Sequence, residues 1–278
     1  MVLKAKSLIK RLLPPIIIEV SKKLLPKEYG FFGDYKSWQE ALNNTTSYEA
    51  EEILNKVKGS LIKVRDGQAI YERDSVIFNE KEYSYPLLAG LLSAANENEG
   101  VLNLIDYGGS LGSTYFQNRE FLKASVKIIK WNVIEQRHFV ECGKKEFENA
   151  ELKFYYSIDK CLEENKANVI LFSGFLQYLE KPMDFLIDIL KYNIKFIIID
   201  RTVFINTDNN SNILTVQKVD PKIYKASYPA WFFNKSKLLK ILEKKYKLIA
   251  EFDCLDQHEL RGYKTYGQGL ILKIKESL

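Results

Sequence analysis

Residues 101–116 constrain the fold more than any other part of this 278-residue chain. The run 101–106 is apolar and ends in an acid, Asp106, after which come a glycine-rich turn and a segment with a helical pattern. A buried strand that ends in such a turn is typical of the carboxyl edge of an α/β sheet, where small ligands bind. Glycine permits the sharp turn because no Cβ obstructs the backbone or the ligand. The segment therefore predicts an α/β fold with a ligand site at this turn.

The spacing of the glycines excludes two common nucleotide sites. Gly108, Gly109 and Gly112 fit no G-x-G-x-x-G frame, and no Gly-Lys-Ser/Thr ending marks a phosphate loop. The frame that fits is acid-x-Gly-x-x-x-Gly, from Asp106 to Gly112. It resembles the first motif of Rossmann-like S-adenosylmethionine (SAM) methyltransferases, although Ser110 stands where that motif has its middle glycine. The alternative is a strand, turn and helix that only pack together.

A second acid follows at the spacing that a ribose site requires. Residues 131–135 are expected to form a short buried strand that ends in Glu135. A carboxylate about 20 residues beyond the glycines can accept hydrogen bonds from both hydroxyls of a ribose, and SAM carries a free ribose. Gln136 would then lie along the adenosine. The alternative for Glu135 is an acid that only favours the dipole at a helix N-terminus.

The remainder of the chain predicts a parallel sheet that is closed by a hairpin. Strand-like runs alternate with helical patterns, and such alternation indicates βαβ units. The runs are 101–106, 131–135, 151–156, 168–172 and 195–200. A helix at 234–245 and two further β-like runs, 246–253 and 269–275, follow. This order resembles the seven-stranded, mostly parallel sheet of class I methyltransferases, in which the last strand is antiparallel.

Charge divides the chain into regions. Residues 1–28 hold seven basic and two acidic side chains, which accounts for the whole formal net charge of +5. The rest is neutral, which argues against a nucleic-acid partner. We expect a basic amphipathic segment at 1–28, a helical lid or cap region at 29–96 and the SAM-binding domain at 97–278. The first segment, a helical N-terminal extension, either packs on a protein surface or contacts an anionic membrane peripherally.

Cysteine and histidine usage bounds the chemistry. Three scattered cysteines suggest neither a disulfide framework nor a zinc site, and two histidines are too few for a histidine-rich metal centre. We therefore expect no metal and a cytoplasmic protein, which lies at the inner face of the membrane if residues 1–28 bind lipid. The longest apolar run there, 12–18, is too short to span a bilayer. The oligomeric state is not predicted.

Three loops at the carboxyl edge supply the candidate catalytic residues. His258 is the histidine expected on this edge, so it is our candidate base for O-methylation, unless it is only a surface histidine. Arg201 either neutralises an anionic acceptor or forms a structural ion pair. Gln177, after the fourth strand, is placed with them. His138, one turn after Glu135, is expected to be structural.

Aromatic residues gather in the predicted loops 29–41 and 201–231. Tyrosine and tryptophan offer a flat apolar face with a polar handle, which suits the faces of sugar rings. The loop 201–231 is longer than most connections within a compact domain, so we expect it to act as a lid. The candidate substrate-binding residues are Tyr35, Trp38, Tyr178, Tyr228 and Trp231.

Several segments together resemble SAM-dependent methyltransferases encoded in bacterial surface-polysaccharide (O-antigen or capsule) clusters. The resemblance covers roughly residues 29–275, and its segments are 29–41, 106–116, 131–136, 173–178, 200–201 and 228–231. It implies SAM as cofactor and a sugar, a glycan or a lipid- or nucleotide-linked sugar as acceptor. In that family the form Asp-x-Gly-Gly-Ser-x-Gly is usual, so Ser110 fits. The implied cofactor-binding residues are Asp106, Gly108, Gly109, Ser110, Gly112, Glu135, Gln136, Ser173, Gly174 and Phe175.

Two other functions stay open. A glycosyltransferase of the same pathway would be expected to carry a metal-binding Asp-x-Asp after a strand, and the sequence has none. A non-catalytic module that binds SAM or a nucleotide could keep Asp106, Gly108 and Glu135 without any chemistry in the acceptor loops.

Overall fold

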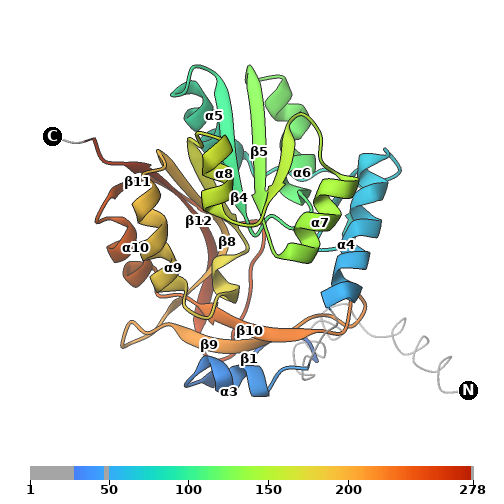
Figure 1. Cartoon of the computed structure of the whole chain (residues 1–278). Helices are drawn as coiled ribbons and strands as arrows, with labels where there is room; N and C mark the ends of the chain where they lie inside the picture. Colours follow the sequence, from blue (N-terminus) through green and yellow to red (C-terminus); the bar gives the residue numbers. More distant parts are fainter. Residues whose placement is uncertain (1–27, 47–49, 277–278) are drawn as a thin grey trace, which may run out of the picture.

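The computed structural model describes residues 28–46 and 50–276. Its centre is a seven-stranded sheet with the order β11-β12-β8-β7-β4-β5-β6 (Figure 1). The strands are β4 (Val101–Tyr107), β5 (Ile128–Ile134), β6 (Leu152–Tyr155), β7 (Val169–Ser173), β8 (Phe196–Asn206), β11 (Tyr246–Asp253) and β12 (Lys264–Ile274). Strands β4 to β8 pair in parallel, and β12 is antiparallel to both of its neighbours. The predicted seven-stranded, mostly parallel sheet with an antiparallel last strand is confirmed.

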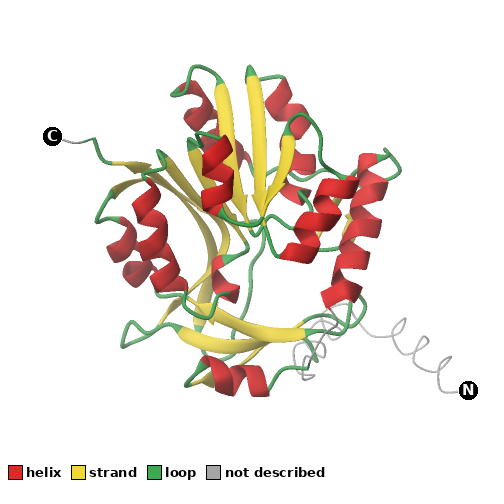
Figure 2. Cartoon of the chain, viewed as in Figure 1, coloured by secondary structure: helices red, strands yellow, loops and turns green. Residues whose placement is uncertain are grey.

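Helices cover both faces of this sheet (Figure 2). Successive residues of a strand point to opposite faces. Leu104 accordingly packs in one core cluster with α4, α5, α6 and α7, while Ile105 packs in another with α8, α9 and α10. Strands buried on both sides read as continuous apolar runs, which is why the sequence pattern located them. The helices are α3 (Trp38–Asn43), α4 (Ala50–Arg65), α5 (Tyr85–Asn96), α6 (Ser113–Lys123), α7 (Arg137–Glu146), α8 (Ile158–Glu164), α9 (Pro182–Ile189) and α10 (Lys235–Leu242), with short 3₁₀ turns η1 (Leu176–Tyr178) and η2 (Leu190–Tyr192).

A second sheet replaces two of the predicted loops. It consists of β1 (Gly30–Tyr35), β9 (Ile213–Lys218) and β10 (Ser227–Phe232), all antiparallel, in the order β1-β9-β10. Strands therefore occupy parts of 29–41 and 201–231 that we expected to form loops, and β8 itself continues to Asn206. The small sheet crosses the carboxyl ends of the parallel strands in Figure 1. Its first strand finds its partner far along the chain, and such a pairing leaves no local signal.

The region 29–96 also contains strands among its helices. A short hairpin joins β2 (Tyr71–Arg73) to β3 (Val76–Phe78). Both turn residues, Asp74 and Ser75, have positive φ, of 51° and 72°, which is the two-residue hairpin geometry normally supplied by Asn-Gly or Asp-Gly. The sequence pattern did not predict this hairpin. The predicted basic segment 1–28 lies outside the described residues except for its last residue.

No helix within the described ranges has both the length and the apolar character that crossing a membrane requires.

Candidate functional site

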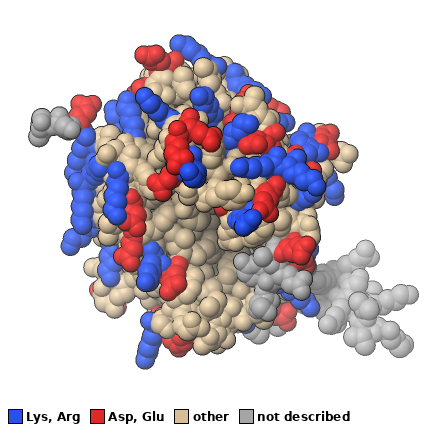
Figure 3. Space-filling model, in the orientation of Figure 1, with Lys and Arg blue, Asp and Glu red and all other residues tan. Residues whose placement is uncertain are grey.

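A cavity of about 480 Å³ lies at the carboxyl ends of the parallel strands, between the large and the small sheet. Pockets of this size hold small molecules, whose usual sites measure roughly 300–1,000 Å³. The face drawn in Figure 3 is hollowed near its centre. Uncharged residues line most of this hollow, and charged side chains lie around its rim. We call one wall the loop side: Gly108, Gly109, Ser110, Glu135 and Gln136. We call a second group of lining residues the aromatic side: Trp38, Tyr71, Tyr178, Tyr224 and Tyr228.

The glycine loop lies between β4 and α6 and requires glycine for two reasons. Gly108 has φ of 74°, a conformation that side chains rarely adopt, and a Cβ there would overlap the ring of Phe175. A Cβ on Gly109 would overlap the carboxylate of Asp106. Gly112 is the residue from which α6 begins, and it does not line the cavity. The backbone of the loop is thus exposed to the cavity at Gly108, Gly109 and Ser110.

Asp106 supports this loop from behind. Its carboxyl group is buried, one oxygen accepts a hydrogen bond from Nε1 of Trp131 at 2.9 Å, and the residue does not line the cavity. Burial raises its pKa to about 7. Its other oxygen, Oδ1, has no hydrogen-bond partner among the described residues. The expected place of Asp106 in a ligand-binding wall is therefore corrected to a place under Gly109.

Glu135 joins the end of β5 to the glycine loop. Its carboxylate accepts hydrogen bonds from the backbone N–H groups of Gln136, at 2.7 Å, and of Ser110. Burial raises its pKa. The glycine loop and Glu135 are separate in the sequence, and we assigned both to one ligand. In the structure they form one wall of one cavity. A ribose contact by Glu135 stays a prediction.

His138 belongs to the same wall, although we expected a structural role. It lies in the first turn of α7, next to Glu135, and it lines the cavity. Its Nε2 is buried and has no hydrogen-bond partner among the described residues. A buried polar atom without a partner is costly unless a ligand or water completes it. The signal for it was its position one turn after Glu135.

The end of β7 and the segment after it contribute some of their residues to the cavity. Ser173 and Gly174 line it, whereas Phe175 and Gln177 do not. The Phe175 ring packs against Tyr107, with centroids 5.0 Å apart. Gln177 is buried, and its Nε2 donates to the backbone carbonyl of Arg201 at 3.2 Å. Gln177 and Phe175 therefore support the wall rather than form it.

Asp200 is a wall residue to which the sequence analysis gave no role. It lies in β8 at the level of Ser173, lines the cavity and is almost fully buried. Its Oδ1 accepts a hydrogen bond from the thiol of Cys254 at 3.5 Å, and burial raises the pKa of Asp200. The available signal was an acid at the carboxyl end of an apolar run, the same signal that identified Asp106 and Glu135.

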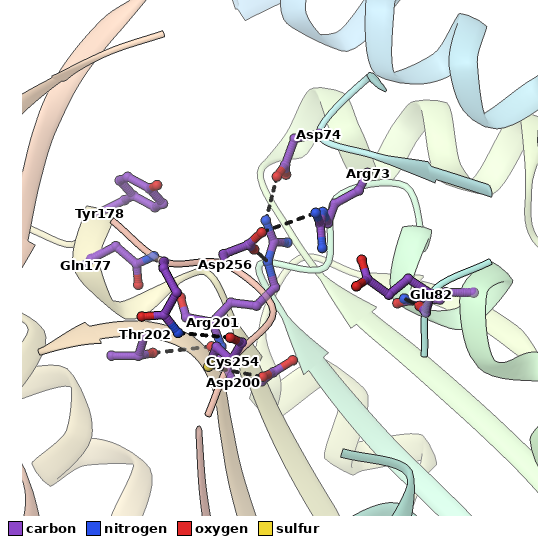
Figure 4. A network of polar contacts seen from close by, with 12 residues as sticks. Arg73, Asp74, Glu82, Gln177, Tyr178, Asp200, Arg201, Thr202, Cys254 and Asp256 are labelled. Atoms are coloured by element: carbon purple, nitrogen blue, oxygen red, sulfur yellow. Dashed lines mark hydrogen bonds and ion pairs between the residues drawn. The ribbon is translucent and has the colours of Figure 1, made fainter. Parts of the chain in front are cut away.

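Arg201 forms ion pairs on both sides (Figure 4). Its Nε and Nη2 lie 2.5 Å from carboxylate oxygens of Asp256 and Asp74, respectively. Arg73 reaches the other oxygen of Asp256 at 3.2 Å. These carboxylates hold the pKa of Arg201 well above its usual value despite burial. Of the two roles expected for Arg201, the ion pair is present in the structure.

His258 does not line the cavity. Its ring packs against Phe31 with centroids 5.0 Å apart, and burial lowers its pKa. Its backbone carbonyl accepts a hydrogen bond from the Thr265 hydroxyl at 2.7 Å. The predicted base is thus held against β1 and β12, and its catalytic role stays a prediction without support from this geometry.

The aromatic side contains three of the five candidate substrate-binding residues. Trp38, Tyr178 and Tyr228 line the cavity, whereas Tyr35 and Trp231 pack behind it. Trp38 stacks on Trp231 at 6.5 Å between centroids, and Tyr178 meets Tyr228 edge-on at 5.2 Å. Tyr71 and Tyr224 also line the cavity, and the sequence analysis missed both because they belong to the hairpin and to the segment after β9.

The chain has no match among protein-family models, and no curated protein matches it. Among solved structures, a SAM-dependent methyltransferase from Methanosarcina mazei is 12% identical over 70% of this chain and 99% of its own, with a TM-score of 0.45. The N-terminal domain of EvdMO1, solved in the presence of S-adenosylhomocysteine (SAH) and D-fucose, is 10% identical over 82% of this chain and 98% of its own, with a TM-score of 0.45. The glycopeptide N-methyltransferase MtfA, in complex with sinefungin, is 9% identical over 67% and 94%, with a TM-score of 0.42. At such identities and TM-scores these likenesses identify neither a cofactor nor an acceptor for this chain.

Proposed function

We propose that this protein is a SAM-dependent methyltransferase. The observation that carries the proposal is the joined loop side, where the carboxylate of Glu135 accepts the N–H of Ser110 beside Gly108 and Gly109. A small ligand with a ribose and a compact charged group fits such a wall. The carboxylate can accept hydrogen bonds from the ribose hydroxyls. The glycines carry no side chain, so the backbone leaves room for the remainder of the ligand.

Different residues of the loop side would hold different parts of the cofactor. Glu135 would take the ribose hydroxyls, and Gln136 and His138 would flank the adenosine, with the unpartnered Nε2 of His138 as a further contact. Ser173 and Gly174 lie where the loop side approaches β8. When bound, SAM would supply a methyl group on a sulfonium sulfur, and SAH would be the leaving group as the acceptor oxygen takes the methyl carbon.

The aromatic side supports a sugar as the acceptor. Aromatic rings stack on the apolar faces of sugar rings and exclude water from the reacting atoms. The guanidinium groups of Arg73 and Arg201 are already paired with carboxylates. This favours an uncharged ring in the cavity, with the phosphate of any lipid- or nucleotide-linked precursor outside it. We propose O-methylation of a sugar of a bacterial surface polysaccharide, by a protein in the cytoplasm or at the inner face of the membrane.

O-methylation also requires a group that takes the proton of the acceptor hydroxyl. Asp200 suits this role better than the predicted His258, because Asp200 lines the cavity and His258 does not. In the sheet Asp200 pairs with Ser173 of β7, which also lines the cavity. Burial raises the pKa of Asp200, and a carboxylate of raised pKa is a stronger base.

Calorimetry on the full chain with SAH, and separately with NAD⁺, tests the cofactor. We expect SAH to bind at micromolar levels and NAD⁺ not to bind. Conversion of SAM to SAH on a surface-glycan extract tests the reaction. Tight NAD⁺ binding without an SAH signal would contradict the cofactor assignment, whereas SAH binding without turnover on any glycan would favour the non-catalytic module.

A further inference from the structure

Three consecutive charged residues of the β2–β3 hairpin contact residues that line the cavity or pair with a residue that lines it. Glu72 accepts a hydrogen bond from the hydroxyl of Ser113 in α6. The side chain of Arg73 pairs with Asp256, and that of Asp74 pairs with Arg201. Figure 4 shows Arg73 and Asp74 reaching from the hairpin toward Asp256 and Arg201. The hairpin thus connects the start of α6 with the middle of β8 across the cavity.

On the loop side, the contact of Glu72 is with the residue that follows the glycine loop. Ser113 is the first residue of α6, directly after Gly112, and it lines the cavity. Glu72 is only 1% exposed and is not itself a wall residue. Its second carboxylate oxygen accepts the N–H of Ser75 at 3.2 Å. A buried carboxylate with a hydroxyl donor fixes the orientation of that hydroxyl and of the turn that carries it.

On the other side, the contact depends on unusual backbone conformations. Asp74, Ser75 and Arg201 are three of only seven non-glycine residues with positive φ in the described ranges. Such conformations cost free energy and persist where the surroundings hold them, which is common at ligand sites. Here they bring the carboxylate of Asp74 and the guanidinium of Arg201 together. Asp74 is the exposed member of this pair, with 63% of its side chain accessible.

We propose that the β2–β3 hairpin is a strap that couples the two sides of the cavity, and that Glu72 is its positioning residue for the glycine loop. Glu72 acts through Ser113, and Arg73 and Asp74 fasten the other end to Asp256 and Arg201. A ligand that orders the glycine loop therefore also orders the hairpin. The proposal rests on the proposed function for the identity of that ligand, an adenosyl compound.

The charge on Glu72 gives this strap a pH dependence. Burial raises the pKa of Glu72 to about 7, and the negative charge of Asp74 adds to the rise. The Ser113 hydroxyl, the Ser75 N–H and the positive charge of Arg201 act in the opposite direction. The carboxylate is therefore increasingly ionised between pH 6 and pH 8. Hydrogen bonds to an ionised acceptor are the stronger ones, so SAH affinity should rise over this range.

Calorimetry with SAH at pH 6, 7 and 8 tests the positioning role. At pH 8 we expect Glu72→Gln to bind SAH about tenfold more weakly, the size of one hydrogen bond to a charged group. Its affinity should also rise less between pH 6 and pH 8 than that of the wild type, in which Glu72 titrates together with Asp106. Ser113→Ala should have a similar effect, and the double variant should be no weaker than the singles, since both remove one contact. Glu72→Asp should recover part of the affinity. Glu80→Gln, at an exposed acid just beyond β3, is the matched control and should bind as wild type.

Hydrogen exchange of residues 71–78 at saturating SAH tests the coupling. SAH should slow exchange of the hairpin in the wild type and fail to slow it in Glu72→Gln, while Asp74→Asn raises its exchange without ligand. If wild type binds SAH and both Glu72→Gln and Ser113→Ala bind it equally tightly, with the same pH dependence, the strap is overturned and the proposed function stands. If wild type binds no SAH, the proposed function fails, and the strap fails with it. If Glu72→Gln does not fold, Ser113→Ala decides the outcome.

Discussion

The loop side and the aromatic side of the cavity are built in different ways. Gly108, Gly109 and Ser110 follow one strand, and Glu135 and Gln136 follow its neighbour, so the loop side consists of short contiguous segments. Trp38, Tyr71 and Tyr228, by contrast, come from α3, the hairpin and the small sheet. The loop side is determined by what the backbone must do locally. The aromatic side exists only once distant segments have packed together.

The largest expected effect concerns the proton acceptor and tests whether chemistry belongs to the cavity wall. Asp200→Asn should lose about 10²–10⁴-fold in turnover while binding SAH normally, because loss of a general base affects the reaction rather than the cofactor. His258→Ala should keep turnover within severalfold of the wild type. Rates would be measured on a glycan extract that supports turnover, with SAH affinity determined in parallel. Loss of turnover in His258→Ala alone would restore the base predicted from the sequence.

A smaller effect tests whether the loop side depends on its backbone. A methyl group on Gly108 faces a left-handed φ and overlap with Phe175, which together cost roughly 2–5 kcal/mol. The loop would move to relieve this strain, and binding would then have to restore its original geometry. We therefore expect Gly108→Ala to weaken SAH binding at least about 30-fold by calorimetry. Gly67→Ala is the control, because Gly67 also has positive φ, 73°, but a Cβ there meets nothing within 4 Å. Equal affinity in the two variants would mean that the loop adapts and that its glycines are not required by a ligand.

The smallest of these effects tests the ribose assignment. Glu135→Ala removes a carboxylate that can accept two ribose hydroxyls, each bond being worth about 1.5–3 kcal/mol before water replaces it. SAH binding should weaken at least tenfold. Glu141→Ala, on the exposed face of α7, is the control and should leave affinity unchanged. A folded Glu135→Ala with wild-type affinity would place the ribose elsewhere.

Much of the loop side could be predicted because its requirements are local. Buried parallel strands need apolar runs, tight turns need glycine, and a carboxylate after the next strand has only one edge of the sheet to occupy. The same reasoning placed Ser173 and Gly174 correctly at the cavity. It could not separate the residues that line the wall from those directly behind it. Asp106, Phe175 and Gln177 satisfy the same pattern but point into the supporting layer.

The sequence alone determined the seven-stranded sheet, its antiparallel last strand and the union of the glycine loop with Glu135. Only the tertiary structure decided that β1 pairs with β9, that a strained hairpin spans the cavity and that Asp200 rather than His258 lines it. The physical reason is the range of the interactions. The spacing of apolar residues and the residue preferences of turns act over a few residues, so they can be recognised in the sequence. The pairing of distant strands and the side on which a loop residue is buried depend on contacts that exist only in the folded chain.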